Sequence, residues 1–107
     1  MAPRRTKRSF AFSGANAAQA KVVFSGTPLN YPVSSALLYN GDLIVGNTGD
    51  NTLVEIQPST MTAVGTKVVD KGAAGAIFGI ATSGTSVAAQ KIYFNDDNTA
   101  TVDLVSQ

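Results

Sequence analysis

Residues 43–56 read Leu-Ile-Val-Gly-Asn-Thr-Gly-Asp-Asn-Thr-Leu-Val-Glu-Ile, and residues 92–104 read Ile-Tyr-Phe-Asn-Asp-Asp-Asn-Thr-Ala-Thr-Val-Asp-Leu. Each stretch is an apolar run, a turn rich in Asn and Asp, and a second run that ends apolar, acidic, apolar. Two antiparallel strands joined by a polar turn have this pattern. The two stretches are about 48 residues apart, so the chain contains an internal repeat of a β unit.

Further strands are predicted on both sides of each copy. Asn40-Gly41 is a strong hairpin signal, because both positions of the tight turn need positive φ. The first unit is therefore a four-stranded meander with strands over 36–39, 43–46, 52–56 and 63–69. The second unit is a three-stranded meander over 76–81, 91–94 and 101–104, and a separate short strand is predicted over 21–24.

Several of these strands carry apolar residues at adjacent positions, as in Leu43-Ile44-Val45 and Ile92-Tyr93-Phe94. Adjacent strand positions point to opposite faces, so such a strand needs apolar cover on both sides. Two sheets cover each other on one side only. We therefore expect the 107-residue chain to lack the material to cover its own strands.

Composition excludes several classes of function. The chain has no Cys, His or Trp, which excludes Ser-His-Asp and Cys-His catalysis, thiolate chemistry and imidazole metal ligands. No apolar window is long enough for a transmembrane helix. Catalysis that depends on His or Cys is therefore not expected.

Half of the eight basic residues lie within the first eight positions, and residues 9–107 carry a net charge of −3. Nucleic-acid binding through the folded part is therefore not expected, because phosphate contacts require clustered cations. Residues 1–19 are interpreted as a basic, disordered leader. The alternative is a signal peptide with a small-x-small cleavage site at Ala18-Gln19-Ala20.

The repeat spacing and its residues resemble the β-propeller repeat proteins of the NHL and YVTN-like kind. The stretches that carry the resemblance are 40–47, 51–56 and the turn at 57–61, with their partial repeats at 91–96 and 102–104. The resemblance implies an all-β fold of four-stranded meander sheets packed as blades. Residues 20–34 would be the outer strand and linker of a preceding blade, 35–70 a full blade and 76–107 an incomplete blade. Met61 stands where the family usually has Gly in a left-handed conformation.

Asp50, Asp96 and Asp97 are the candidate metal ligands. They lie in corresponding turns of the two copies, and carboxylate oxygens of this kind bind Ca²⁺. The alternative is that Asp and Asn occur here because they form turns. Glu55 and Asp103 also correspond, and as outward residues of alternating strands they are interpreted as surface charges rather than an acid/base pair.

The sequence leaves three functions open. The first is a non-catalytic binding or scaffold segment of a propeller, with other blades or a second copy as partner and an unknown ligand. The second is a fragment of a metal-dependent, lactonase-like propeller hydrolase that uses the three aspartates. The third is a truncated reading frame without a function of its own. An extracellular or periplasmic location is implied by the resemblance alone.

Overall fold

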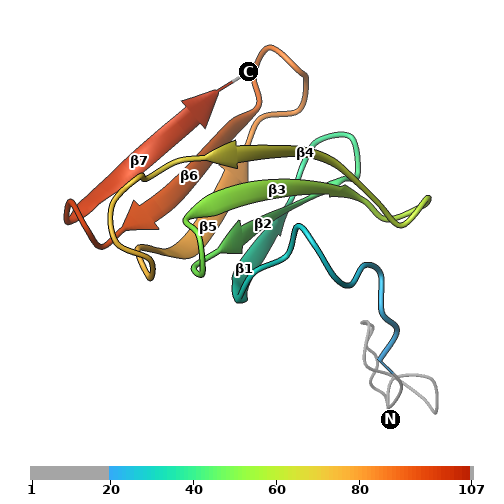
Figure 1. Cartoon of the computed structure of the whole chain (residues 1–107). Helices are drawn as coiled ribbons and strands as arrows, with labels where there is room; N and C mark the ends of the chain where they lie inside the picture. The colour runs from blue at the N-terminus through green and yellow to red at the C-terminus, as the bar shows by residue number, and fades with distance from the viewer. Residues whose placement is uncertain (1–19, 107) are drawn as a thin grey trace, which may run out of the picture.

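The structure is a computed structural model that describes residues 20–106, so the predicted leader (1–19) and Gln107 lie outside the described residues. The all-β prediction is confirmed. Seven strands form two antiparallel sheets, and no helix occurs between residues 20 and 106 (Figure 1). This part of the chain accordingly has no helix long and apolar enough to cross a membrane.

The first sheet is a meander with strand order β1-β2-β3-β4. Its strands are β1 (Pro32–Leu37), β2 (Leu43–Asn47), β3 (Thr52–Gln57) and β4 (Thr62–Val68). Leu38 leaves the strand early, because its amide and carbonyl close the Asn40-Gly41 turn through bonds to the Asp42 carbonyl and the Gly41 amide. Met61 begins the return to β4 with a φ of 54°.

The second sheet is a meander with strand order β5-β6-β7. Its strands are β5 (Ile77–Ser83), β6 (Lys91–Asp96) and β7 (Thr101–Ser106). Among the described residues β7 has a single strand neighbour, β6, whereas the corresponding strand β3 lies between β2 and β4.

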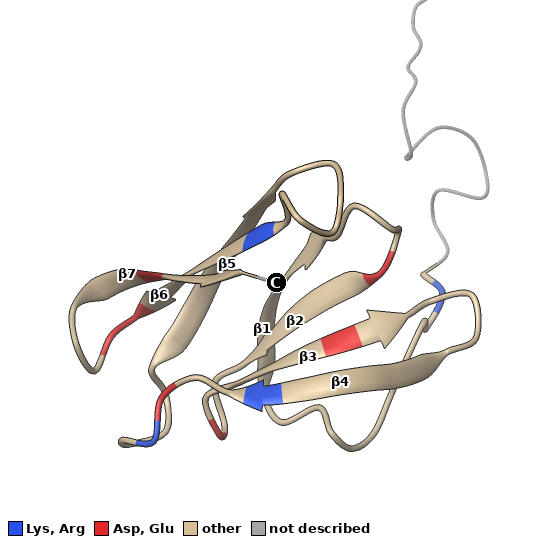
Figure 2. Ribbon diagram, turned by 90° about the horizontal axis from the view of Figure 1, so that it is seen from above, with Lys and Arg blue, Asp and Glu red and all other residues tan. Residues whose placement is uncertain are grey.

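The strand predicted over 21–24 is not formed in the structure. A strand is stabilised by hydrogen bonds to a neighbouring strand, and no strand of the described residues lies beside this segment. The segment over residues 20–31, called here the N-terminal segment, instead runs along the side of the first sheet that faces away from the second sheet (Figure 2).

The two sheets meet through the strands at one side of each meander, β1 and β2 against β5. They diverge toward β4 and β7 (Figure 2). Gly46 allows close approach at this contact, because a Cβ atom built on it would lie 2.8 Å from the Cδ1 atom of Ile80. Between the sheets lies a buried apolar core of Leu38, Ile44, Leu53, Ala76, Ile77, Ile92 and Phe94.

The two sheets have equivalent strand pairing over their first three strands. Thr52 pairs with Asn47 where β3 begins, and Thr101 pairs with Asp96 where β7 begins. Each first strand has a register shift near its start, after Pro32 in β1 and after Ile77 in β5. The strand pairing therefore makes Ile44 equivalent to Tyr93, Val45 to Phe94, Leu53 to Val102 and Ile56 to Val105.

The equivalence gives each sheet a front face and a rear face. In the first sheet the front face contains Ile44 and Leu53 and the rear face contains Val45 and Val54. In the second sheet the equivalent front face contains Tyr93, Val102 and Leu104, and the rear face contains Ile92, Phe94 and Val105. Because the core joins Ile44 to Phe94, the front of the first sheet packs against the rear of the second. The sheets are therefore stacked in the same orientation. In a two-layer sandwich they would instead pack with equivalent faces toward each other.

The rear face of the first sheet is covered within the chain. Val54 and Ile56 are almost completely buried although neither belongs to the core between the sheets. Val23 and Leu29 of the N-terminal segment line a common cavity with Val45 on this face. The expectation that the chain has no cover for its outer faces was therefore wrong for part of the first sheet, where Val54 and Ile56 are buried and Val23 and Leu29 lie beside Val45.

Candidate functional site

The candidate metal ligands occupy two separate turns. Asp50 is exposed in the β2–β3 turn, where its carboxylate accepts a hydrogen bond of 2.7 Å from the Thr52 hydroxyl. Asp96 is buried at the end of β6, and Asp97 is exposed in the following turn. Among residues 20–106 no group of three or more His, Cys, Asp or Glu side chains is arranged to hold a metal ion. Calcium binding by the three aspartates stays a prediction.

Asp96 has a different partner, Asp70, in the connection between the sheets. Burial, together with the adjacent Asp70 carboxyl, raises the pKa of Asp96, whereas the hydrogen bond from Asp96 lowers the pKa of Asp70. Asp70 also accepts bonds from the Gly72 amide (2.6 Å) and the Asn98 side chain (3.1 Å). The interaction with Asp96 and the bond from Asn98 tie the connection between the sheets to the β6–β7 turn.

Two buried asparagines at the β2–β3 turn hold the segments before and after the first sheet. The Asn47 side chain accepts a bond from the Asn30 amide and donates one to the Pro28 carbonyl. The Asn51 side chain accepts a bond of 3.0 Å from the Ala76 amide and donates one of 2.8 Å to the Ala73 carbonyl. Asn51 has a φ of 56°, which Asn adopts more readily than most residues.

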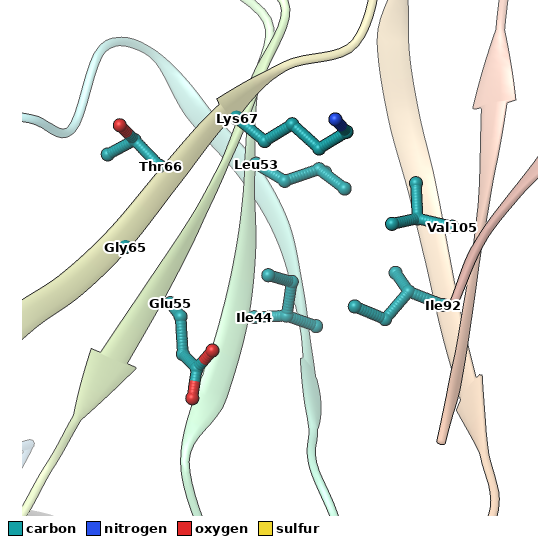
Figure 3. Close-up of a pocket in the computed structure, with 8 residues that line it drawn as sticks. All are labelled: Ile44, Leu53, Glu55, Gly65, Thr66, Lys67, Ile92 and Val105. Atoms are coloured by element: carbon teal, nitrogen blue, oxygen red, sulfur yellow. The ribbon is translucent and has the colours of Figure 1, made fainter. Parts of the chain in front are cut away.

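A cleft of about 180 Å³ opens where the two sheets diverge (Figure 3). Its floor is apolar, and Glu55 and Lys67 approach it from opposite ends. The residues that line it are Ile44, Leu53, Glu55, Gly65, Thr66, Lys67, Ile92 and Val105. The cleft thus presents one carboxyl group, Glu55, and one amine, Lys67, beside a mainly apolar lining.

Glu55 shares its surroundings with a second carboxyl group, Asp42. Partial burial, followed by the hydrogen bond and the charge of Asp42, raises the pKa of Glu55. The side chain of Asn40 opposes this effect, and it also caps the Asp42 amide at 3.0 Å. Glu55 thus lies on the front face of the first sheet under conditions that favour its neutral form.

This raised pKa predicts a dependence of stability on pH. A carboxyl whose pKa is higher in the folded state contributes stability that is complete below the ordinary Glu value of 4.5 and is lost as pH rises through the folded-state pKa. Glu55→Gln is therefore expected to melt at a higher temperature than the wild type at pH 7, with the difference disappearing at pH 4. Thermal unfolding measured over this pH range, with Asp97→Asn as the control, tests it. An equal difference at both pH values would contradict the assignment.

The most unusual surface of the molecule is the front face of the second sheet. Ala81, Tyr93 and Leu104 lie in one row across this sheet, with Val102 beside them. Val102 is 69% exposed and Leu104 is 51% exposed, whereas their equivalents on the first sheet lie at the core or the cleft. Leu53, the equivalent of Val102, is only 3% exposed. The same face is thus buried in one sheet and open in the other, which makes it the candidate binding surface.

Comparisons with models of known protein families, with curated protein sequences and with solved structures found no match for this chain.

Proposed function

We propose that this chain is a non-catalytic scaffold module of the β-propeller kind, whose function is to stack with further sheets and present their loops. The observation that supports it is the stacking of two equivalent sheets in the same orientation, front against rear. Such stacking can continue, because each added sheet offers the next one the same face. A two-layer sandwich, in contrast, is complete once its two inner faces meet.

The charge distribution supports a scaffold rather than a binder of nucleic acid. The four lysines of the described residues form no cluster, because they lie on four different parts of the chain: the N-terminal segment, β4, the connection between the sheets and β6 (Figure 2).

Docking would bury apolar area at the front face of the second sheet, which stabilises a complex by about 25 cal/mol per Å². The partner surface is therefore apolar, as the rear face of the first sheet is.

Sedimentation equilibrium tests this proposal. The wild type is expected to show a molar mass that rises with concentration above the 11.0 kDa of the monomer. Leu104→Lys places a charge on the docking face and is expected to keep the monomer mass throughout. Val64→Lys, which alters an equally exposed residue of β4, is expected to behave as the wild type. A wild type that stays at 11.0 kDa at every concentration would contradict the proposal.

A further inference from the structure

The N-terminal segment contains a copy of the end of β4. Residues 21–23 and residues 67–69 are both Lys-Val-Val, and in each case Gly follows three residues after the last Val, at Gly26 and Gly72. In the first sheet Lys67 pairs with Leu53 and Val68 pairs with Thr52, so this tripeptide is the last part of a fourth strand. In the N-terminal segment the same tripeptide has no strand beside it among residues 20–106.

The connections after the two tripeptides also correspond. The Ala76 carbonyl accepts a bond of 2.9 Å from the Asp97 amide, and the Tyr31 carbonyl accepts one of 3.0 Å from the Thr48 amide. Asp97 directly follows β6, and Thr48 directly follows β2. Ala76 directly precedes β5, and Tyr31 directly precedes β1. The N-terminal segment therefore enters the first sheet in the way that the connection from β4 enters the second.

Lys21 lies beside the first sheet near the β3–β4 turn. Lys67 lines the cleft with Val105. Lys21 lines a cavity with Pro58, which is two residues beyond Ile56, the equivalent of Val105. The tripeptide thus lies on the rear side of the first sheet, where a preceding sheet would stack, although residues 20–106 contain no such sheet.

We propose that residues 21–23 of one copy pair with the free edge of β7 in a second copy and supply the fourth strand of its second sheet. The front face of that sheet then packs against the rear face of the first sheet of the donating copy. This inference rests on the proposed stacking and names its partner as a second copy of the chain. By equivalence with β4, Val22 is placed opposite Thr101 and Lys21 opposite Val102.

Side-chain sizes at the two contacts are consistent with this partner. Within the chain Gly46 faces the large residues Ile77 and Ile80. On the front face of the second sheet, the larger Asn95 is the equivalent of Gly46. On the rear face of the first sheet, the smaller Pro32 and Ser35 are the equivalents of the two isoleucines. A gain in volume on one surface is thus matched by a loss on the other.

The arrangement is head to tail, because one copy uses its second sheet and the other uses its first sheet and N-terminal segment. Such an interface repeats until it closes into a ring or grows as an open chain. Residues 24–29 have to shift from the rear face to admit the incoming sheet. Tyr31, which is 76% exposed here, would be buried at the position that Ala76 occupies between the two sheets.

Disulfide trapping tests the pairing. Because the chain has no Cys, only the introduced thiols can form a disulfide. Val69 donates to the carbonyl of its opposite residue Asn51, so Val68 and Thr52 form the next, non-hydrogen-bonded pair, with Cα atoms about 4.5 Å apart. The equivalent pair between copies is Val22 and Thr101. Mixed Val22→Cys and Thr101→Cys chains are expected to give at least tenfold more disulfide-linked heterodimer than mixed Val22→Cys and Val64→Cys chains.

The outcomes separate this inference from the proposed function. Preferred linkage of positions 22 and 101 supports the pairing. If the wild type associates in the centrifuge but position 22 links to position 64 as readily as to 101, the strand pairing is overturned and stacking remains. If the wild type does not associate and the Val22→Cys and Thr101→Cys chains do not link, both are overturned.

Discussion

Replacement of Asn51 by Ala is expected to lower the free energy of unfolding by about 3 kcal/mol, measured by urea denaturation. The substitution leaves the buried amide of Ala76 without its partner, at roughly 1–3 kcal/mol, and removes one of the two hydrogen bonds to the Ala73 carbonyl, which still accepts a bond from Asn98. It also puts Ala at a φ of 56°, which costs about 1 kcal/mol more. These terms act at the connection that positions the second sheet on the first.

The neighbouring Asp50 is the matched control for Asn51. Its side chain is exposed and bonds only to Thr52 within the same turn, so Asp50→Ala is expected to change the free energy of unfolding by less than about 0.5 kcal/mol. If Asn51→Ala were as mild as Asp50→Ala, the connection between the sheets would not depend on this amide.

Phe94→Ala is expected to have the other large effect, a loss of about 3–5 kcal/mol in the free energy of unfolding. Phe94 is 2% exposed in the core between the sheets, and its removal leaves a cavity there. Urea denaturation at a concentration where the chain is monomeric gives the value.

Val102→Ala is the control for Phe94→Ala, because it shortens a side chain of the same sheet on the opposite face. Val102 is 69% exposed, so the unfolding free energy of the monomer is expected to stay close to that of the wild type, while association weakens. Similar losses of monomer stability in the two variants would show that the faces have been assigned wrongly.

The strands could be predicted from sequence because their signals are local. Alternation, the Asn40-Gly41 turn and the repeat around residues 43–56 lie within single hairpins. The strand over 21–24 was predicted on an equally local signal and was wrong for the described residues, since a strand also requires a neighbour. The side chains alone show that Lys21-Val22-Val23 is suited to a strand, and only the sheet order shows that its neighbour is missing.

The polar contacts could not be predicted in the same way. Asp70 lies 26 residues before Asp96, in a connection with no regular pattern, and only the folded chain brings the two carboxyl groups together. Asn47 and Asn51 are conspicuous in the sequence only as turn residues, whereas the structure shows that both hold neighbouring segments. The exposed front face of the second sheet was partly foreseeable, because Tyr93, Val102 and Leu104 are apolar or aromatic positions on an otherwise buried repeat.

The amide hydrogen of Val102 tests most directly the central claim, that the second sheet repeats the first with three strands among the described residues and that a second copy pairs with the edge of β7. Its equivalent, Leu53, pairs with Lys67, so the Val102 amide points to the free edge of β7. Hydrogen exchange followed by NMR in dilute and concentrated solution is expected to show this amide exchanging at least tenfold more slowly when concentrated, with the amide of the exposed loop residue Ser86 as reference. An exchange rate for Val102 that does not change with concentration would contradict the claim.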